Sequence, residues 1–114
     1  MLVIGWTTTS SQPQAETLGR ALVGARLAAC AQIEGPVTSI YHWEDELQTD
    51  AEWRLTLKFL PQHQDAVEKR LHELHPYETP QWVTVIADHV AEKYLSWAKA
   101  NSSSLPFNAS QAPI

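Results

Sequence analysis

The stretch from Val37 to Leu60 constrains the fold of this chain more than any other. In its second half, every other residue from Trp53 to Phe59 is apolar, and the residues between them are polar. This period of two predicts a strand with one apolar and one polar face. The first half, from Val37 to Trp43, is divided less cleanly, so we expect that strand to be covered on both sides. Together the two halves predict a long antiparallel hairpin.

The turn of this hairpin is expected in the acidic run from Glu44 to Asp50. The run has no Asn-Gly or Asp-Gly pair, so the sequence does not fix the turn type. Both strands exceed the usual length of about 5–6 residues. A small domain cannot easily cover the far end of so long a hairpin. We therefore expect other copies of the chain to cover it.

Aromatic residues of the hairpin are the candidates for that subunit interface. Five tryptophans among 114 residues is a high number, and tryptophan is enriched in protein interfaces. Packing in a core or an interface is favoured over base stacking, which would need basic flanks that the sequence lacks. The predicted interface residues are Tyr41, Trp43 and Trp53.

Before the hairpin, the sequence predicts one strand and one helix. The apolar segment Leu2–Thr8 is typical of a buried strand. Ser11, followed three residues later by Gln14, fits a capping box at the start of a helix. Glu34-Gly35-Pro36 is expected to break the chain before the hairpin begins.

After the hairpin, the sequence predicts a helix, a strand and a terminal helix. Pro61 can open the first helix, and His75-Pro76 ends it because the residue before a proline avoids helical geometry. Trp82–Ala87 is an apolar, β-branched strand, and Asp88 is expected to cap the last helix. The order β-α-β-β-α-β plus a helix predicts an α+β, ferredoxin-like split βαβ fold with a long central hairpin.

Chain length and composition fit one domain. A chain of 114 residues is long enough to bury a core of its own. Residues 1–101 are predicted to form that domain. Residues 102–114 contain serines and prolines with little charge, so we expect a flexible C-terminal tail.

The charge and cysteine content exclude several classes of protein. A net charge of −5 argues against nucleic-acid binding, which needs clustered Lys and Arg. The single cysteine rules out an intramolecular disulfide framework and suits a reducing compartment. No apolar window is long enough to span a bilayer. We expect a cytoplasmic protein with no membrane insertion and no nucleic-acid partner.

Cys30, His42 and Glu44 are the candidate metal ligands. A thiolate suits Cu(I), and His42 and Glu44 at i and i+2 of one strand would share a face. The alternatives are ordinary: a lone cysteine among alanines is often a small buried hydrophobe, and a charged hairpin tip often serves to block aggregation.

A polar pocket is predicted around Lys58, His75, Tyr77 and Glu78. Lys58 comes near the end of the second hairpin strand, and the proline-rich connector from His75 to Pro80 is stiff. A lysine in such a pocket could hold an anion. The alternative is a buried ion pair between Lys58 and Glu78.

Several motifs together carry a resemblance to a known family. In chain order they are Ala25–Cys30, Thr38–Tyr41 with Trp43-Glu44, Leu57-Lys58, Leu74–Pro80 and Tyr94–Trp97. With their order and spacing over roughly residues 2–100, they resemble the CutA divalent-cation tolerance family. The chain departs from the family pattern at Ala31-Gln32, Asp45-Glu46, Phe59 and Gln81.

The resemblance implies a ferredoxin-like subunit in a tight homotrimer that is built by strand pairing between subunits. It also implies a cytoplasmic protein linked to tolerance of copper and other divalent metals. The family's trimer is similar in plan to the PII signalling proteins, and no enzymatic reaction is attached to it.

Two functional hypotheses follow. The first is a homotrimer that binds or responds to copper or another divalent metal without catalytic turnover. No metal is expected to be an obligatory cofactor. The alternative is a PII-like regulator that binds a small anionic ligand between subunits, with Lys58 and Tyr77 in the pocket. An enzyme ranks last, because we find no nucleophile-base pair and no phosphate-binding loop.

Overall fold

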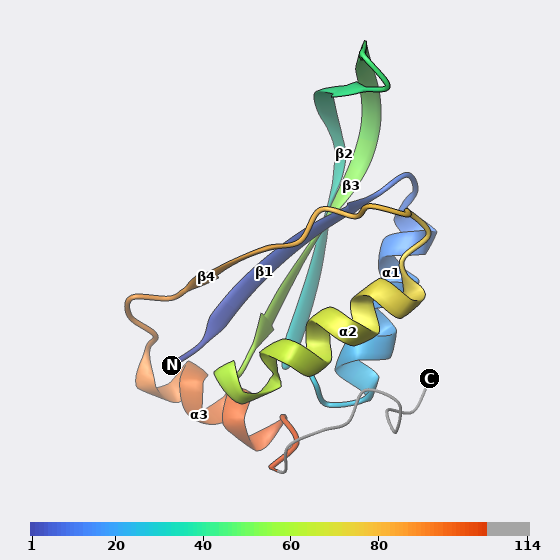
Figure 1. Ribbon diagram of the computed structural model, residues 1–114. Coiled ribbons are helices and arrows are strands. Elements are labelled where there is room, and N and C mark those ends of the chain that lie inside the picture. The colour runs from blue at the N-terminus through green and yellow to red at the C-terminus, as the bar shows by residue number, and fades with distance from the viewer. Residues whose placement is uncertain (105–114) are drawn as a thin grey trace.

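The computed structural model describes residues 1–104, and residues 105–114, which hold most of the predicted tail, lie outside the described residues. The predicted order of elements is confirmed (Figure 1). The elements are β1 (Val3–Thr9), α1 (Gln12–Gly24), β2 (Cys30–Trp43), β3 (Glu46–Phe59), the 3₁₀ turn η1 (Pro61–His63), α2 (Gln64–Leu74), β4 (Val83–Ile86) and α3 (Glu92–Ala100).

The four strands form one antiparallel sheet in the order β2-β3-β1-β4. This is the predicted α+β, ferredoxin-like arrangement. The apolar face of β3 meets α1 and α2, which confirms the alternation from Trp53 to Phe59. Leu55, Leu57 and Phe59 are all 0% exposed. They pack with Leu18 and Leu22 of α1, with Val67 and Leu71 of α2, and with Val3 of β1.

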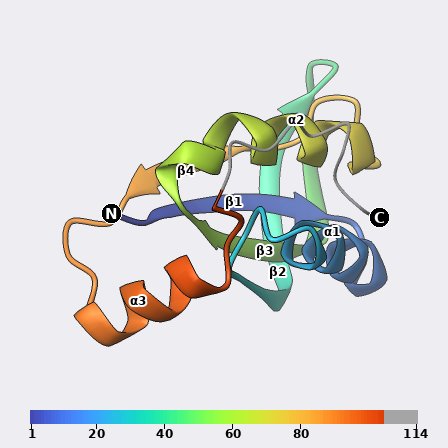
Figure 2. The same cartoon turned by 90° about the horizontal axis from the view of Figure 1, so that it is seen from below.

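Helix α3 closes the end of the sheet opposite the hairpin tip (Figures 1 and 2). It contributes Ala98 to a second, smaller apolar cluster with Leu2, Ala29 and Leu60. No helix within residues 1–104 is long and apolar enough to cross a membrane.

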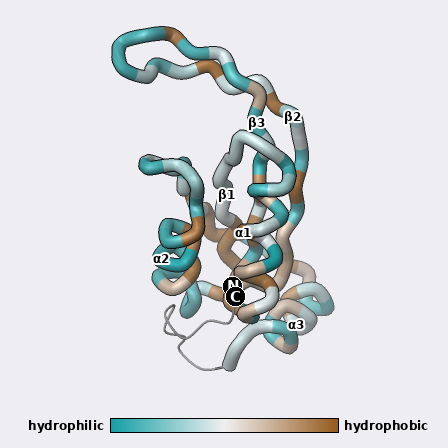
Figure 3. Tube along the Cα trace, turned by 90° about the vertical axis from the view of Figure 1, so that its right-hand side faces the viewer, coloured by the Kyte–Doolittle hydropathy of each residue, from teal (hydrophilic) through white to brown (hydrophobic). Residues whose placement is uncertain are grey.

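The outer part of the hairpin extends beyond the rest of the sheet. Pairing of β3 with β1 ends at Thr9 and Trp53, so from Val37 and Glu52 outward β2 and β3 pair only with each other. We call this segment, residues 37–52, the hairpin arm. Figures 1 and 3 show it projecting from the body, with hydrophobic positions among hydrophilic ones.

The first hairpin strand begins earlier than predicted. It starts at Cys30, and Glu34-Gly35-Pro36 does not break it but shifts the register between Glu34 and Val37. Two physical reasons allow this. Proline lacks a backbone donor, which is tolerated in β2 because it is an edge strand. Gly35 has no Cβ, and an added one would lie 2.5 Å from the Trp53 ring.

The hairpin turn is much shorter than predicted. Only Glu44 and Asp45 lie between the strands, and both have positive φ, at 51° and 63°. Positive φ at both central residues is the pattern of a type I′ turn, which matches the twist of the flanking strands. The Asn-Gly signal that usually marks such a turn is replaced here by two acidic residues.

The predicted N-terminal cap is present in α1 and absent in α3. The Ser11 hydroxyl accepts the N–H of Gln14 at 3.3 Å, as predicted, while the Gln14 side chain accepts the N–H of Ser10. Asp88 does not cap α3, which begins at Glu92 after Ala91 without a side-chain cap. The prediction of that cap was therefore wrong.

The start of the predicted tail is attached to the domain. The Ser102 hydroxyl donates to the carbonyl of Ala98 at 2.7 Å, and the Ser103 N–H donates to the carbonyl of Arg26 at 2.9 Å. The folded unit therefore reaches at least Ser103.

Candidate functional site

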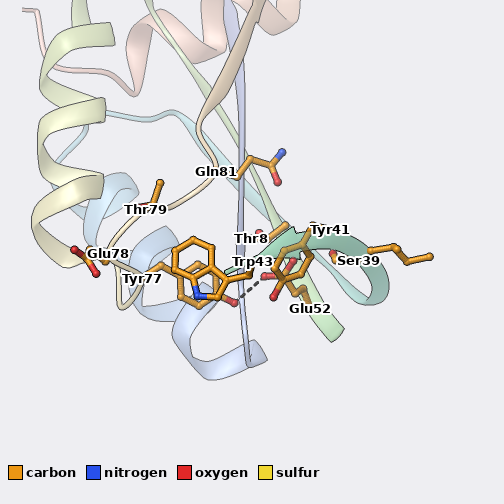
Figure 4. Close-up of a pocket in the computed structure, with 10 residues that line it drawn as sticks. Thr8, Ser39, Tyr41, Trp43, Glu52, Tyr77, Glu78, Thr79 and Gln81 are labelled. Atoms are coloured by element: carbon orange, nitrogen blue, oxygen red, sulfur yellow. Dashed lines mark hydrogen bonds between the residues drawn. The ribbon is translucent and has the colours of Figure 1, made fainter. Parts of the chain in front are cut away.

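A cleft lies where the hairpin arm leaves the sheet, and we call it the junction cleft (Figure 4). Its volume is about 610 Å³. Three parts of the chain line it: the end of β1, the arm, and the connector between α2 and β4. The lining residues are Thr8, Ser39, Ile40, Tyr41, Trp43, Glu52, Tyr77, Glu78, Thr79 and Gln81.

His75 fixes the connector against β1 behind the cleft. Its Nδ1 accepts the backbone N–H of Tyr77 at 3.1 Å, so the ring proton resides on Nε2. Nε2 then donates to the carbonyl of Thr8 at 2.9 Å and lies 3.0 Å from the hydroxyl of Thr7. Burial lowers the pKa of His75. The neutral imidazole is therefore the form that this network holds.

Two tyrosine hydroxyls donate to carboxylates of β3. The Tyr77 hydroxyl donates to Glu52 at 2.7 Å, drawn as the dashed line in Figure 4. The Tyr41 hydroxyl donates to Asp50. Burial, followed by the hydrogen bond to Glu52, raises the pKa of Tyr77 well above its usual range. Tyr77 therefore stays protonated as a donor, and it joins the connector to the arm.

The predicted pocket residues do not all come together. Tyr77 and Glu78 line the junction cleft and His75 supports it. Lys58 lies elsewhere: it pairs with Ile4 in β1, and its Nζ is 5.4 Å from the centroid of the Tyr94 ring in α3. Within residues 1–104 Lys58 forms no ion pair with Glu78.

The position of Lys58 along β3 explains why it lies far from the junction cleft. Lys58 is six residues beyond Glu52 on β3, a distance of about 20 Å along an extended strand. The described lining of the cleft includes two carboxylates, Glu52 and Glu78, and no Lys, Arg or His. The hypothesis of an anion site with Lys58 in this cleft receives no support from the geometry.

The three candidate metal ligands lie apart. Cys30 is half-buried at the start of β2, beside Glu16 and Arg20 of α1. His42 is near the other end of the same strand, and Glu44 is in the turn, where the strand alternation that would align the two no longer applies. In the described part of the chain, no three His, Cys, Asp or Glu side chains group in a way that could hold a metal ion.

The sequence predicted an interface role for three aromatic residues of the hairpin, but it did not indicate that two of them line a cleft. Tyr41 and Trp43 face it, whereas Trp53 lies against Gly35 and packs on the main core. Glu52 was not singled out, because it is one of several polar residues in an alternating strand. Only its hydrogen bond to Tyr77, 25 residues away, distinguishes it.

Comparison with known proteins gives a consistent result. The model of the family "CutA1 divalent ion tolerance protein" matches residues 3–101. The divalent-cation tolerance protein CutA of Escherichia coli is 33% identical over 99 residues, which cover 87% of this chain and 88% of that protein.

Solved structures agree with the sequence match. The divalent cation tolerance protein Cut A1 from Thermus thermophilus is 34% identical, with a TM-score of 0.85 over 90% of this chain and all of that one. CutA1 from the psychrotrophic bacterium Shewanella sp. SIB1 is 33% identical, with a TM-score of 0.86 over 90% of this chain and 96% of the other. This chain therefore belongs to the CutA1 divalent ion tolerance protein family.

Proposed function

We propose that this protein is a homotrimeric, cytoplasmic divalent-cation tolerance protein that binds or responds to copper and other divalent metals without catalytic turnover. The exposure of apolar side chains on the hairpin arm is the main support for the assembly. Ile40 and Leu47 are 67% and 66% exposed, and Trp43 is 52% exposed. An apolar ribbon of this kind favours burial against another protein surface.

The edges of the sheet support self-association. The strand order leaves one side of β2 and one side of β4 without a partner in the described chain. Unpaired strand edges are templates for pairing with another chain. On β4, Val83, Val85 and Ile86 are also exposed. Copies of the same subunit, arranged around a threefold axis, would bury both the arm and these edges.

Sedimentation velocity tests the assembly. We expect a species of three times the chain mass of 12.8 kDa at micromolar protein concentration. Leu47→Lys places a charge on the arm and should dissociate the assembly. Val23→Lys, at an exposed apolar residue of α1, is the matched control and should leave the mass unchanged. A folded wild-type subunit that sediments alone would overturn the trimer.

Metal binding is proposed across subunits. A single described chain does not group enough ligands, whereas a threefold axis could bring together three copies of Cys30, or of His42 with Glu44. Soft thiolates would select Cu(I), and imidazole with carboxylate would suit Cu(II) or Zn(II). The hypothesis of metal binding therefore depends on how the subunits assemble.

Calorimetry with Cu(II), and with Cu(I) under reducing anaerobic conditions, tests this. We expect saturable binding that Cys30→Ala weakens for Cu(I) and His42→Ala weakens for Cu(II). His89→Ala, at an exposed histidine of the loop before α3, is the control. If both test variants bind like the wild type, these residues are not the ligands.

A further inference from the structure

The junction cleft combines aromatic walls with negative charge. Tyr41, Trp43 and Tyr77 contribute three rings, and Glu52 and Glu78 contribute two carboxylates. Figure 4 shows Tyr41, Trp43 and Glu52 of the arm beside Tyr77 of the connector, whereas the carboxylate of Glu78 points away from them. Because no Lys, Arg or His belongs to the described lining, nothing there neutralises the two carboxylates.

The carboxylates keep room for a further donor. Only the Oε2 atom of Glu52 accepts the Tyr77 hydroxyl, and an ionised carboxylate has about four acceptor positions. Glu52 is half-buried, and a partly desolvated carboxylate interacts more strongly with a cation than an exposed one. Glu78 has no hydrogen-bond or ion-pair partner within residues 1–104.

The rings select the kind of cation. Tryptophan and tyrosine faces attract a cation that lies within about 6 Å of the ring centroid. The indole of Trp43 also offers apolar surface, so a ligand with an aliphatic part would cover surface that a bare ion would leave wet. The volume of about 610 Å³ falls in the range of small-molecule sites.

We propose that the junction cleft binds a small organic ammonium ion. Its alkyl part lies against Trp43, and its ammonium group donates to Glu52 and faces the tyrosine rings. The residues named here all belong to one chain. In the proposed trimer, Tyr41 and Trp43 would place it at the boundary between subunits.

A set of four-carbon probes isolates the head group. Butylamine, butanol and butyrate share the alkyl part and differ in charge. Tryptophan fluorescence and calorimetry at neutral pH and low salt should show saturable binding of butylamine alone. Tetramethylammonium, which cannot donate a hydrogen bond, should bind more weakly than butylamine. Equal binding of butanol or butyrate, or no saturable binding of butylamine, would overturn the proposal.

Variants locate the site. Glu52→Gln keeps the shape and an acceptor for Tyr77 but removes the charge, and it should weaken butylamine binding about tenfold or more. Trp43→Leu should weaken it and remove most of the fluorescence response. Glu34→Gln, whose carboxylate pairs with Arg54 outside the cleft, should bind like the wild type. Unchanged binding by a folded Glu52→Gln would overturn the assignment of the carboxylate.

Sedimentation of the same samples separates this proposal from the trimer. If the protein sediments as a trimer but does not bind butylamine, the ammonium site is rejected and the trimer stands; a neighbouring chain that fills the cleft would give this result. If the protein sediments as a single subunit and binds butylamine, the trimer is rejected and the ammonium site stands.

Discussion

Leucines near the two ends of β3 lie on the same face of the strand but meet different surroundings. Near its C-terminal end, Leu57 is 0% exposed under α1 and α2, whereas near the tip Leu47 is 66% exposed. The contrast teaches that a period of two identifies the apolar face of a strand and says nothing of what covers it.

Element lengths explain the contrast. The 13 residues of α1 span about 20 Å as a helix, while the 14 residues of β3 span about 45 Å as a strand. A helix of that length can cover only the inner half of the hairpin. The arm must therefore project beyond the helices, and the junction cleft forms at the point where α1 no longer covers the hairpin.

The largest expected difference is between two leucines of β3. Leu57→Ala should lower the free energy of unfolding by about 2–5 kcal/mol, because it leaves a cavity in the core. Leu47→Ala should stay within about 0.5 kcal/mol for a single subunit, because the side chain is exposed there.

Urea unfolding at several protein concentrations checks this pair. The loss from Leu57→Ala should not depend on concentration. A loss from Leu47→Ala that grows as subunits associate would support burial of the arm in the assembly. Equal losses at every concentration would contradict the division of β3 into covered and uncovered ends.

Two glycines that face tryptophan rings sharpen the comparison. A Cβ on Gly5 would lie 2.4 Å from the Trp82 ring, and one on Gly35 would lie 2.5 Å from the Trp53 ring. Gly5→Ala should cost about 1–3 kcal/mol, because Trp82 is stacked on Phe59 in the core. Gly35→Ala should cost less, because Trp53 can shift toward solvent at the start of the arm.

Gly24→Ala provides the control for these variants, because a Cβ at the end of α1 would meet nothing within 4 Å. Thermal unfolding should show that it is neutral or slightly stabilising. A larger loss for Gly35→Ala than for Gly5→Ala would show that the sheet is packed more tightly at Gly35, just before the arm, than at Gly5.

The junction between the two regions should respond to pH. The pKa of His75 is lowered mainly by burial and also by nearby His72, against the opposing effects of the Thr8 carbonyl and Glu52. The unfolded chain therefore takes up its proton first as pH falls below the ordinary value of 6.5. Stability is complete above that pH and falls until the folded-state pKa is passed.

Urea unfolding between pH 8 and pH 5 measures this slope. His75→Gln should flatten it, because the titrating group is removed. A His75→Gln slope as steep as that of the wild type would assign the pH dependence to other groups.

The smallest expected effect is at the tip of the arm. Glu44 has a φ of 51°, a conformation that asparagine tolerates better than glutamate. Glu44→Asn should stabilise the hairpin by about 0.5–1 kcal/mol. Asp45→Ala, at the neighbouring position with a φ of 63°, should destabilise it. Thermal unfolding of the two variants, with opposite signs expected, checks the turn type.

The junction cleft itself was only partly predictable. The connector from His75 to Pro80 was recognisable by its two prolines, and its residues Tyr77 and Glu78 line the junction cleft. Lys58 was wrongly joined to them, because a strand pattern gives the face of a residue but not its height along the sheet. Glu52 was missed for the same reason.

The sequence by itself determined the order of the elements, the apolar face of β3 and the family, because these depend on periodicity and local motifs. Tertiary structure decided where the cover of the hairpin ends, where the turn lies and which carboxylate meets Tyr77. These features depend on the register between strands and on the relative lengths of helices and strands. Such distances arise only when segments far apart in the chain are packed together.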